Sequence, residues 1–243
     1  MTEPMPAPWS KCSAEENHRW LLAEFAGLLV ERAPESLLDV GCGTGLLLAK
    51  CREAGIAVCG LDQAGLKLDA LREAGFEVSE GSAYQLPFAD RSVDWVCMRH
   101  VPHHLEDPAR ALAEAQRVAR TGVLVAEPYF EPSVGSQRGA IALDRFEKRQ
   151  HRRRGMFHAE VLDLGALLSF LPPGYERDFE VFVQHHLRLR ARSVRDFATA
   201  AAELLEALPA EHPEHEALAE LLRELERLGL SWNGSLCLTL LRR

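Results

Sequence analysis

The sequence predicts an α/β fold with a doubly wound, mostly parallel sheet and helices on both of its faces. One observation is that five short apolar segments alternate with stretches of helical periodicity between residues 37 and 127. The other is that the first of these segments, 37–40, runs into a turn with glycines at 41, 43 and 45. A strand that turns through glycines into a helix builds a ligand cradle at the carboxyl end of the strand. The helix's first backbone N–H groups, which have no partners within the helix, are expected to face that ligand.

Composition narrows the function classes. The chain has 243 residues, 47% of them hydrophobic, which suits one large domain spanning residues 1–243. No apolar stretch is long enough to cross a membrane, and Met1–Ser10 does not resemble a secretory signal. The six cysteines form no C-x-x-C pair, so reduced thiols in a cytoplasmic protein are expected, with no disulfide and no metal site. A net charge of −8 disfavours a nucleic-acid partner.

The elements expected in the first half follow the alternation of apolar periodicities. An amphipathic helix at 14–32 precedes the first strand, and Gly55 and Gly75 mark the ends of two helices. The predicted strands are 37–40, 56–61, 76–80, 92–98 and 122–127, and the predicted helices between them are 46–54, 63–74 and 106–120.

The pattern loosens after residue 130. Residues 135–155 form a basic segment, which is most often one solvated face of a helix. The remaining predicted elements are a helix at 157–170, a strand at 175–190, two amphipathic helices at 193–208 and 212–228, and a strand at 230–241. The segments 135–155 and 193–228 are the candidate insertions that would cap a substrate, although 193–228 could equally form a dimer surface. The chain is expected to be a monomer or a homodimer.

The glycine turn has its own ligand preference. Its spacing, Gly41-x-Gly43-x-Gly45, is one residue tighter than the dinucleotide fingerprint, which disfavours a nicotinamide-dependent oxidoreductase. Asp39 lies two residues upstream and would favour a ligand with an ammonium group over a pyrophosphate. The segment 39–45, Asp-Val-Gly-Cys-Gly-Thr-Gly, closely resembles the first motif of class I S-adenosylmethionine-dependent methyltransferases.

This resemblance covers residues 14–127 and implies both a cofactor and a fold. The cofactor would be S-adenosyl-L-methionine, with its amino-acid end at the glycine turn. The fold would be a Rossmann-like sheet of seven strands that ends in an antiparallel hairpin, here separated by the two-helix insertion. An N-terminal helix often covers the cofactor or substrate in this family, but a packing role is expected for most residues of 14–32.

Two further positions are expected to contact the cofactor. Asp62 ends the second strand 21 residues after Gly41, where a carboxylate can accept hydrogen bonds from a ribose diol, although it could also cap the next helix. In related methyltransferases an acidic side chain meets the adenine amino group where this chain has Ser82, while the Ala83 amide could bond a ring nitrogen. The full set of expected cofactor contacts is Asp39, Gly41, Cys42, Gly43, Gly45, Asp62, Gln63, Ser82, Ala83 and Met98.

Candidate catalytic residues follow the fourth and fifth strands. The carboxyl ends of parallel strands line the ligand crevice, so Met98, Arg99, His100 and His103 are expected near the reacting methyl group. His100, His103 and Tyr129 are the candidate general bases if the acceptor needs deprotonation. A structural cap is the common alternative for the histidines, and Asp94 matches a position that is architectural in the family.

The resulting hypothesis is a methyltransferase that acts on a small molecule by direct in-line displacement. One alternative is an RNA- or tRNA-directed enzyme that uses the basic segment 138–154. Another is a cofactor-binding protein on a methyltransferase scaffold without catalysis, to which Ser82 points.

Overall fold

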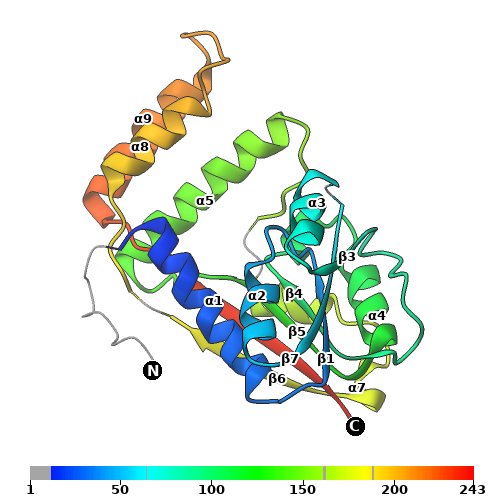
Figure 1. Ribbon diagram of the computed structural model, residues 1–243. Coiled ribbons are helices and arrows are strands. Elements are labelled where there is room, and N and C mark those ends of the chain that lie inside the picture. Colours follow the sequence, from blue (N-terminus) through cyan, green and yellow to red (C-terminus); the bar gives the residue numbers. More distant parts are fainter. Residues whose placement is uncertain (1–11, 64, 161–162, 188) are drawn as a thin grey trace.

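A seven-stranded sheet runs through the middle of the molecule in the order β3-β2-β1-β4-β5-β7-β6. The computed structural model describes residues 12–63, 65–160, 163–187 and 189–243. Figure 1 shows helices on both sides of the sheet and a group of helices at one end. The predicted α/β class and the seven-stranded, mostly parallel sheet are both confirmed.

The parallel half of the sheet follows the predicted alternation closely. β1 pairs in parallel with both β2 and β4, so the chain winds outward in both directions from the first strand. The strands of this half are β1 (Ser36–Val40), β2 (Ala57–Asp62), β3 (Glu77–Glu80), β4 (Val93–Arg99) and β5 (Ala119–Tyr129). The helices around them are α1 (Ala14–Val30), α2 (Leu46–Glu53), α3 (Gly65–Glu73), the single 3-10 turn η1 (Pro102–His104) and α4 (Pro108–Val118).

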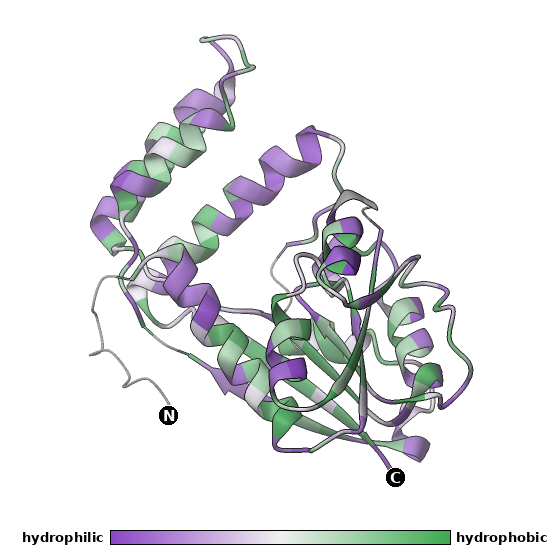
Figure 2. Cartoon of the chain, in the orientation of Figure 1, coloured by the Kyte–Doolittle hydropathy of each residue, from purple (hydrophilic) through white to green (hydrophobic). Residues whose placement is uncertain are grey.

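Each face of the sheet has its own hydrophobic core. Leu22 and Phe25 of α1 and Cys51 of α2 pack with Leu37 and Trp95 on one face. On the other face, α4 packs against alternate residues of the same strands. Because successive strand side chains point to opposite faces, these two cores account for the nearly continuous apolar runs of β4 and β5. Figure 2 shows the central strands as mainly hydrophobic.

An antiparallel hairpin completes the sheet. β7 (Gly234–Arg242) pairs antiparallel with both β5 and β6 (Phe179–His186). The predicted strand at 175–190 is too long at its start, because the short helix α7 (Tyr175–Asp178) precedes β6. The helix predicted at 157–170 is also shorter, since only α6 (Leu164–Ser169) is helical and residues 161–162 lie outside the described part of the chain.

Three helices form a unit beyond the sheet, which we call the helical arm: α5 (Gly135–Arg153), α8 (Val194–Glu203) and α9 (Pro213–Leu228). Phe146, Phe197 and Leu225 pack at its centre. Figure 1 shows the α8–α9 pair extending away from the sheet. The buried Gln137 of α5 donates to Ser231 Oγ at 2.6 Å, which connects the base of the arm to the segment that leads into β7. The two insertions predicted from the sequence thus share one core.

Some of the basic side chains of α5 form ion pairs with acidic residues of the helical arm. Arg149 donates to both carboxylate oxygens of Glu214 on α9, at 2.9 and 2.8 Å. Lys148, only 3% exposed, pairs with Asp144 at 3.0 Å. Figure 2 shows the outer half of α5 as hydrophilic, and the predicted solvated face is correct for Arg145, whose side chain is 61% exposed. It is wrong for Lys148, because that side chain packs toward an acidic partner.

Among the helices of the described residues, none has the length and apolar character needed to cross a membrane.

Candidate cofactor site

The three glycines of the turn between β1 and α2 have different physical roles. All three have a positive φ, at +74°, +55° and +75° for Gly41, Gly43 and Gly45. A Cβ on Gly41 would lie 2.5 Å from Val101, and one on Gly45 would lie 2.3 Å from Leu71. A Cβ on Gly43 would meet no atom within 4 Å. Packing therefore requires the outer two glycines, whereas the middle one faces open space that a ligand can enter.

Three amides of the turn itself, which precede the start of α2, are already hydrogen-bonded within the protein. The Gly41 and Cys42 amides donate to the Leu61 carbonyl at 2.7 and 3.2 Å. The Gly43 amide donates to Asp62 Oδ2 at 2.7 Å. β2 therefore fixes the shape of the turn, and the open side of Gly43 is what remains for a ligand.

Asp62 joins the turn to a cavity. Its Oδ1 accepts from the Gln63 amide at 2.7 Å, so each carboxylate oxygen has one backbone donor. A carboxylate has about four acceptor sites, which leaves capacity for two hydroxyl donors. Asp62 and Gln63 both line a cavity of about 340 Å³ at the carboxyl edge of the sheet. This volume is in the range of small-ligand sites.

Several predicted site residues meet around this cavity. Gly41, Asp62, Gln63, Ala83 and His100 line it. His104, Val101 and Leu105 also line it, although Val101 and Leu105 were not expected there. Both residues come within six positions of the end of β4. The only feature of the sequence that could have indicated them is that they follow a buried strand. The crevice is therefore lined by residues of and around η1 as well as by the strand ends.

Other candidates lie away from this cavity. Met98 is fully buried in the core between the sheet and α4, so it does not reach the cavity wall. The Ser82 hydroxyl accepts from the Tyr84 amide at 3.2 Å, which makes it a turn residue. Cys42 is buried with Leu48 and Leu68 beneath α2 and α3.

Asp39 and Arg99 form a second polar region under α1. Asp39 is 3% exposed, and burial raises the pKa of its carboxyl to about 7. Burial also lowers the pKa of Arg99, although the Asp39 charge opposes that shift. Within the described part of the chain, Arg99 Nη2 is buried and has no hydrogen-bond partner. A buried acid near a partly buried cation with an unused buried donor complements a ligand that presents both an ammonium and a carboxylate.

The three candidate bases have different surroundings. Burial, followed by the Arg99 charge, holds the pKa of His100 well below its usual range, so its imidazole is neutral near pH 7. His103 is 6% exposed, and its Nδ1 lies 2.5 Å from Glu127 Oε2. Tyr129 donates to Glu131 at 3.1 Å, and burial raises its pKa. Of the three, His100 lines the cavity.

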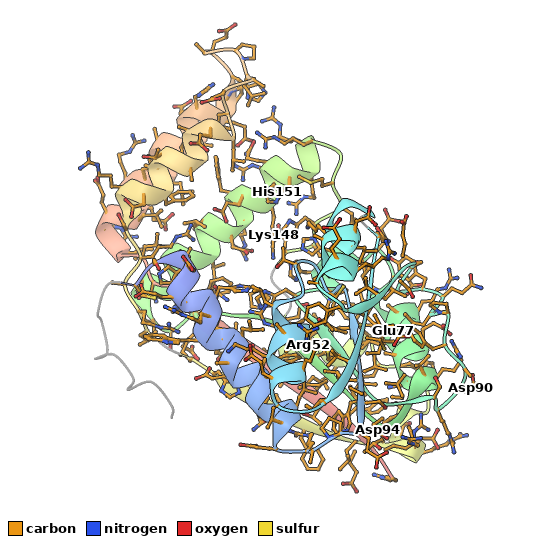
Figure 3. All side chains as sticks on the ribbon, viewed as in Figure 1. Arg52, Glu77, Asp90, Asp94, Lys148 and His151 are labelled. Carbon is orange, nitrogen blue, oxygen red and sulfur yellow. The ribbon has the colours of Figure 1, made fainter. Side chains whose placement is uncertain are left out.

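Asp94 is architectural, as expected. Its Oδ2 accepts from the amides of Glu35 and Ser36 at 2.9 and 3.2 Å, and its Oδ1 accepts from Arg120 Nε at 2.8 Å. Burial raises the pKa of the Asp94 carboxyl, but these hydrogen bonds outweigh it and lower the pKa. Figure 3 shows Asp94 at the edge of the sheet away from Lys148 on α5. Its carboxylate fastens the start of β1 to the start of β4.

Comparison with known proteins agrees with this geometry. Residues 38–126 match the family described as "Methyltransferase domain". A demethylmenaquinone methyltransferase from Renibacterium salmoninarum is 35% identical over 128 residues, which cover 51% of this chain and 53% of that protein. The matches span between 32% and 64% of the length of such curated relatives.

Solved structures share the fold at low identity. A SAM-dependent methyltransferase from Archaeoglobus fulgidus superposes with a TM-score of 0.57 at 16% identity, over 94% of this chain and 96% of that one. The [4+2]-cyclase SpnF superposes with a TM-score of 0.59 at 20% identity, over 96% of this chain and 85% of that one. The glycine turn with its open central position and the strand order agree with the family match over residues 38–126. Residues 38–126 therefore match a methyltransferase domain, and the fold of the chain is that of S-adenosylmethionine-dependent methyltransferases.

Proposed function

We propose that the chain is an S-adenosylmethionine-dependent methyltransferase that acts on a small-molecule acceptor. The observation that supports this most is the open position at Gly43, next to a carboxylate that lines a ligand-sized cavity. A Cβ would fill the space, so the open position fits a ligand that approaches the backbone closely.

Different residues would contact different parts of the cofactor. Asp62 would accept from the ribose hydroxyls, and the Ala83 region of the cavity wall would hold the adenine. Asp39 and Arg99 would hold the ammonium and carboxylate of the amino-acid end, because their charges are complementary and Arg99 has an unused donor. Gly41 and Gly45 would act indirectly, by allowing the turn to pack against Val101 and Leu71.

The cofactor would supply a methyl group that a positively charged sulfur already activates. The protein's share of the reaction is then mainly to align the acceptor and exclude water. His100 is placed to orient an acceptor, since its neutral ring lines the cavity and its buried Nε2 has no partner among the described residues. Its lowered pKa makes it a weak base, so positioning is the role that we assign to it.

Two observations support a small acceptor over RNA. The cationic side chains Lys148 and Arg149 pair with Asp144 and Glu214, so they are not available for phosphates. The net charge of −8 also opposes a polyanion. The name of the Renibacterium relative indicates a small acceptor for that protein. The helical arm is our candidate for the part of the protein that selects the acceptor.

A second candidate is a cofactor-binding protein without methyl transfer. Ser82 stands where related methyltransferases place an acidic residue. Its hydroxyl accepts a hydrogen bond from the Tyr84 amide in its own turn. The SpnF structure has the same fold under the name of a [4+2]-cyclase, so the fold alone does not fix the reaction.

The test measures binding and turnover separately. Calorimetry with S-adenosylmethionine and S-adenosylhomocysteine gives affinity, and a panel of phenol, quinol, thiol, amine and carboxylate acceptors gives S-adenosylhomocysteine formation. Binding with turnover on one acceptor class supports the proposal. Binding without turnover across the panel supports the second candidate, and absence of binding contradicts both.

A further inference from the structure

Three histidines meet at the carboxyl edge of the sheet, and we call His103, His104 and His158 the histidine cluster. One ring nitrogen from each lies within 4.8 Å of the others. The ring centroids are 4.2 Å apart for His103 and His104 and 4.4 Å apart for His104 and His158. Three imidazole nitrogens at this spacing can reach a single ion.

Two separate segments build the cluster and are fastened to each other. His103 and His104 belong to η1, whereas His158 follows the end of α5. The Ala159 amide donates to the His103 carbonyl at 2.8 Å. Arg152 of α5 donates to the His158 carbonyl at 2.7 Å. One backbone hydrogen bond and one from the Arg152 side chain therefore hold the two segments together without any contribution from a ligand.

Outer partners fix two of the rings. Glu127 Oε2 lies 2.5 Å from His103 Nδ1, and the Glu127 side chain is fully buried on β5. His151 Nδ1 lies 2.9 Å from His158 Nδ1. A histidine that ligates a metal through one nitrogen usually has the other nitrogen bonded to a carboxylate or another polar group. The nitrogen left on each ring is Nε2, and no described residue bonds the buried Nε2 of His158.

The charge around the cluster is compatible with a divalent cation. Two nearby cations would oppose it: Lys148, which Figure 3 shows with His151 on α5, and Arg152, which lies 3.8 Å from the Glu160 carboxylate. The Lys148 ammonium is paired with Asp144 Oδ2 at 3.0 Å. The buried Glu127 carboxylate remains as a negative charge behind His103, and its Oε1 has no hydrogen-bond partner among the described residues.

We propose that His103, His104 and His158 bind a divalent cation of the zinc type, with Glu127 as the positioning residue for His103. Imidazole suits Zn²⁺ and its neighbours among the transition metals. Three protein ligands leave one position open on a tetrahedral ion. His104 lines the cavity as well as belonging to the cluster, so this open position adjoins the cavity. An oxygen or sulfur ligand from a bound small molecule could then occupy it. The proposed ion site does not depend on methyl transfer.

The experiment uses the full chain after removal of metals with a chelator. Zn²⁺ binding is measured by calorimetry, and Co²⁺ binding by the visible absorption that marks tetrahedral nitrogen coordination. We expect one ion per chain. His104→Ala and His158→Ala should each weaken binding at least about tenfold, and Glu127→Gln should weaken it by about 10–100-fold.

A matched control removes a histidine elsewhere. His185 is exposed on β6, where its ring lies tilted against Tyr129 with the ring centroids 4.5 Å apart, so His185→Ala should bind Zn²⁺ like the unchanged protein. Circular dichroism establishes that each variant is folded, and His104 and His158 suit this test because His104 is exposed and His158 is partly exposed. Equal affinity in all variants, or no Co²⁺ absorption, would overturn the proposal. Calorimetry with S-adenosylmethionine on metal-free protein tests the proposed function separately.

Discussion

Asp62 accepts a hydrogen bond from the backbone amide of Gly43, with 2.7 Å between its Oδ2 and that nitrogen. This contact links the tip of β2 to the centre of the glycine turn, so one carboxylate both shapes the turn and lines the cavity. The proposed cofactor site therefore joins the carboxyl ends of two neighbouring strands. The contribution of Asp62 to cofactor binding can be compared with that of a carboxylate that has only a structural role.

Asp62→Asn should weaken S-adenosylmethionine binding by about 10–100-fold, because a charge-assisted acceptor is worth roughly 1.5–3 kcal/mol. Calorimetry measures the affinity. Asp94→Asn is the matched control, since Asp94 also accepts from two backbone amides but lies at the opposite edge of the sheet. The control should lose stability and retain affinity. Equal affinity for Asp62→Asn and the unchanged protein would remove the ribose role.

Gly43→Ala should abolish tight cofactor binding at a folding cost of about 1–2 kcal/mol, the cost of a left-handed residue with a Cβ. Gly75→Ala provides the comparison, because Gly75 also has a positive φ, +76°, and open space around its Cβ position. Both variants should therefore lose similar stability in urea unfolding. Only Gly43→Ala should lose binding, and retained binding would show that the space at Gly43 is not used by the ligand.

Asp39 should make the cofactor-free protein less stable as the pH rises through 7. Its folded pKa of about 7 lies above the ordinary 3.8, so the folded state binds more protons than the unfolded state between those values. The stabilising contribution is present below the lower value and is lost through the upper one. Urea midpoints at about pH 5 and about pH 8 measure this. Asp39→Asn should gain stability relative to the unchanged protein mainly at the higher pH, and an identical pH dependence in both proteins would refute the assignment.

Glu214→Gln should loosen the helical arm without weakening the sheet. Glu214 receives both hydrogen bonds from Arg149 and one from Gln150 at 2.6 Å, so its neutral analogue should cost about 1–3 kcal/mol. Hydrogen exchange should accelerate in α8 and α9 and stay unchanged in β1 and β4. Glu224→Gln on the same helix is the control, because Glu224 reaches only Arg227 at 4.0 Å on the surface. Faster exchange in both variants would contradict the anchoring role of Glu214.

Local sequence patterns were sufficient for most of the fold. The apolar runs of β4 and β5 and the glycines after α2 and α3 have direct backbone causes, so their elements were predicted within a few residues. The start of β6 was not, because Tyr175–Asp178 forms a short helix whose cause lies in the turn at Gly174, with its φ of +79°. Such a turn leaves little trace in hydrophobic periodicity.

The site was harder to predict because its contacts are long-range. The spacing between Gly41 and Asp62 predicted that both belong to one site, but only coordinates separate the packing glycines from the open one. The basic segment pairs with Glu214, which lies 65 residues beyond Arg149. The expectation of no metal site considered cysteines, whereas the histidine cluster joins two distant segments. Pairings of this kind have no local signature.

The most direct test of the account is a calorimetric titration of the purified protein with S-adenosylmethionine, alongside the Gly43→Ala variant. We predict saturable binding of one molecule per chain in the unchanged protein and none in the variant. Absence of binding to the unchanged protein at millimolar cofactor, or equal binding to both proteins, would contradict the claim that the open side of the glycine turn receives the cofactor.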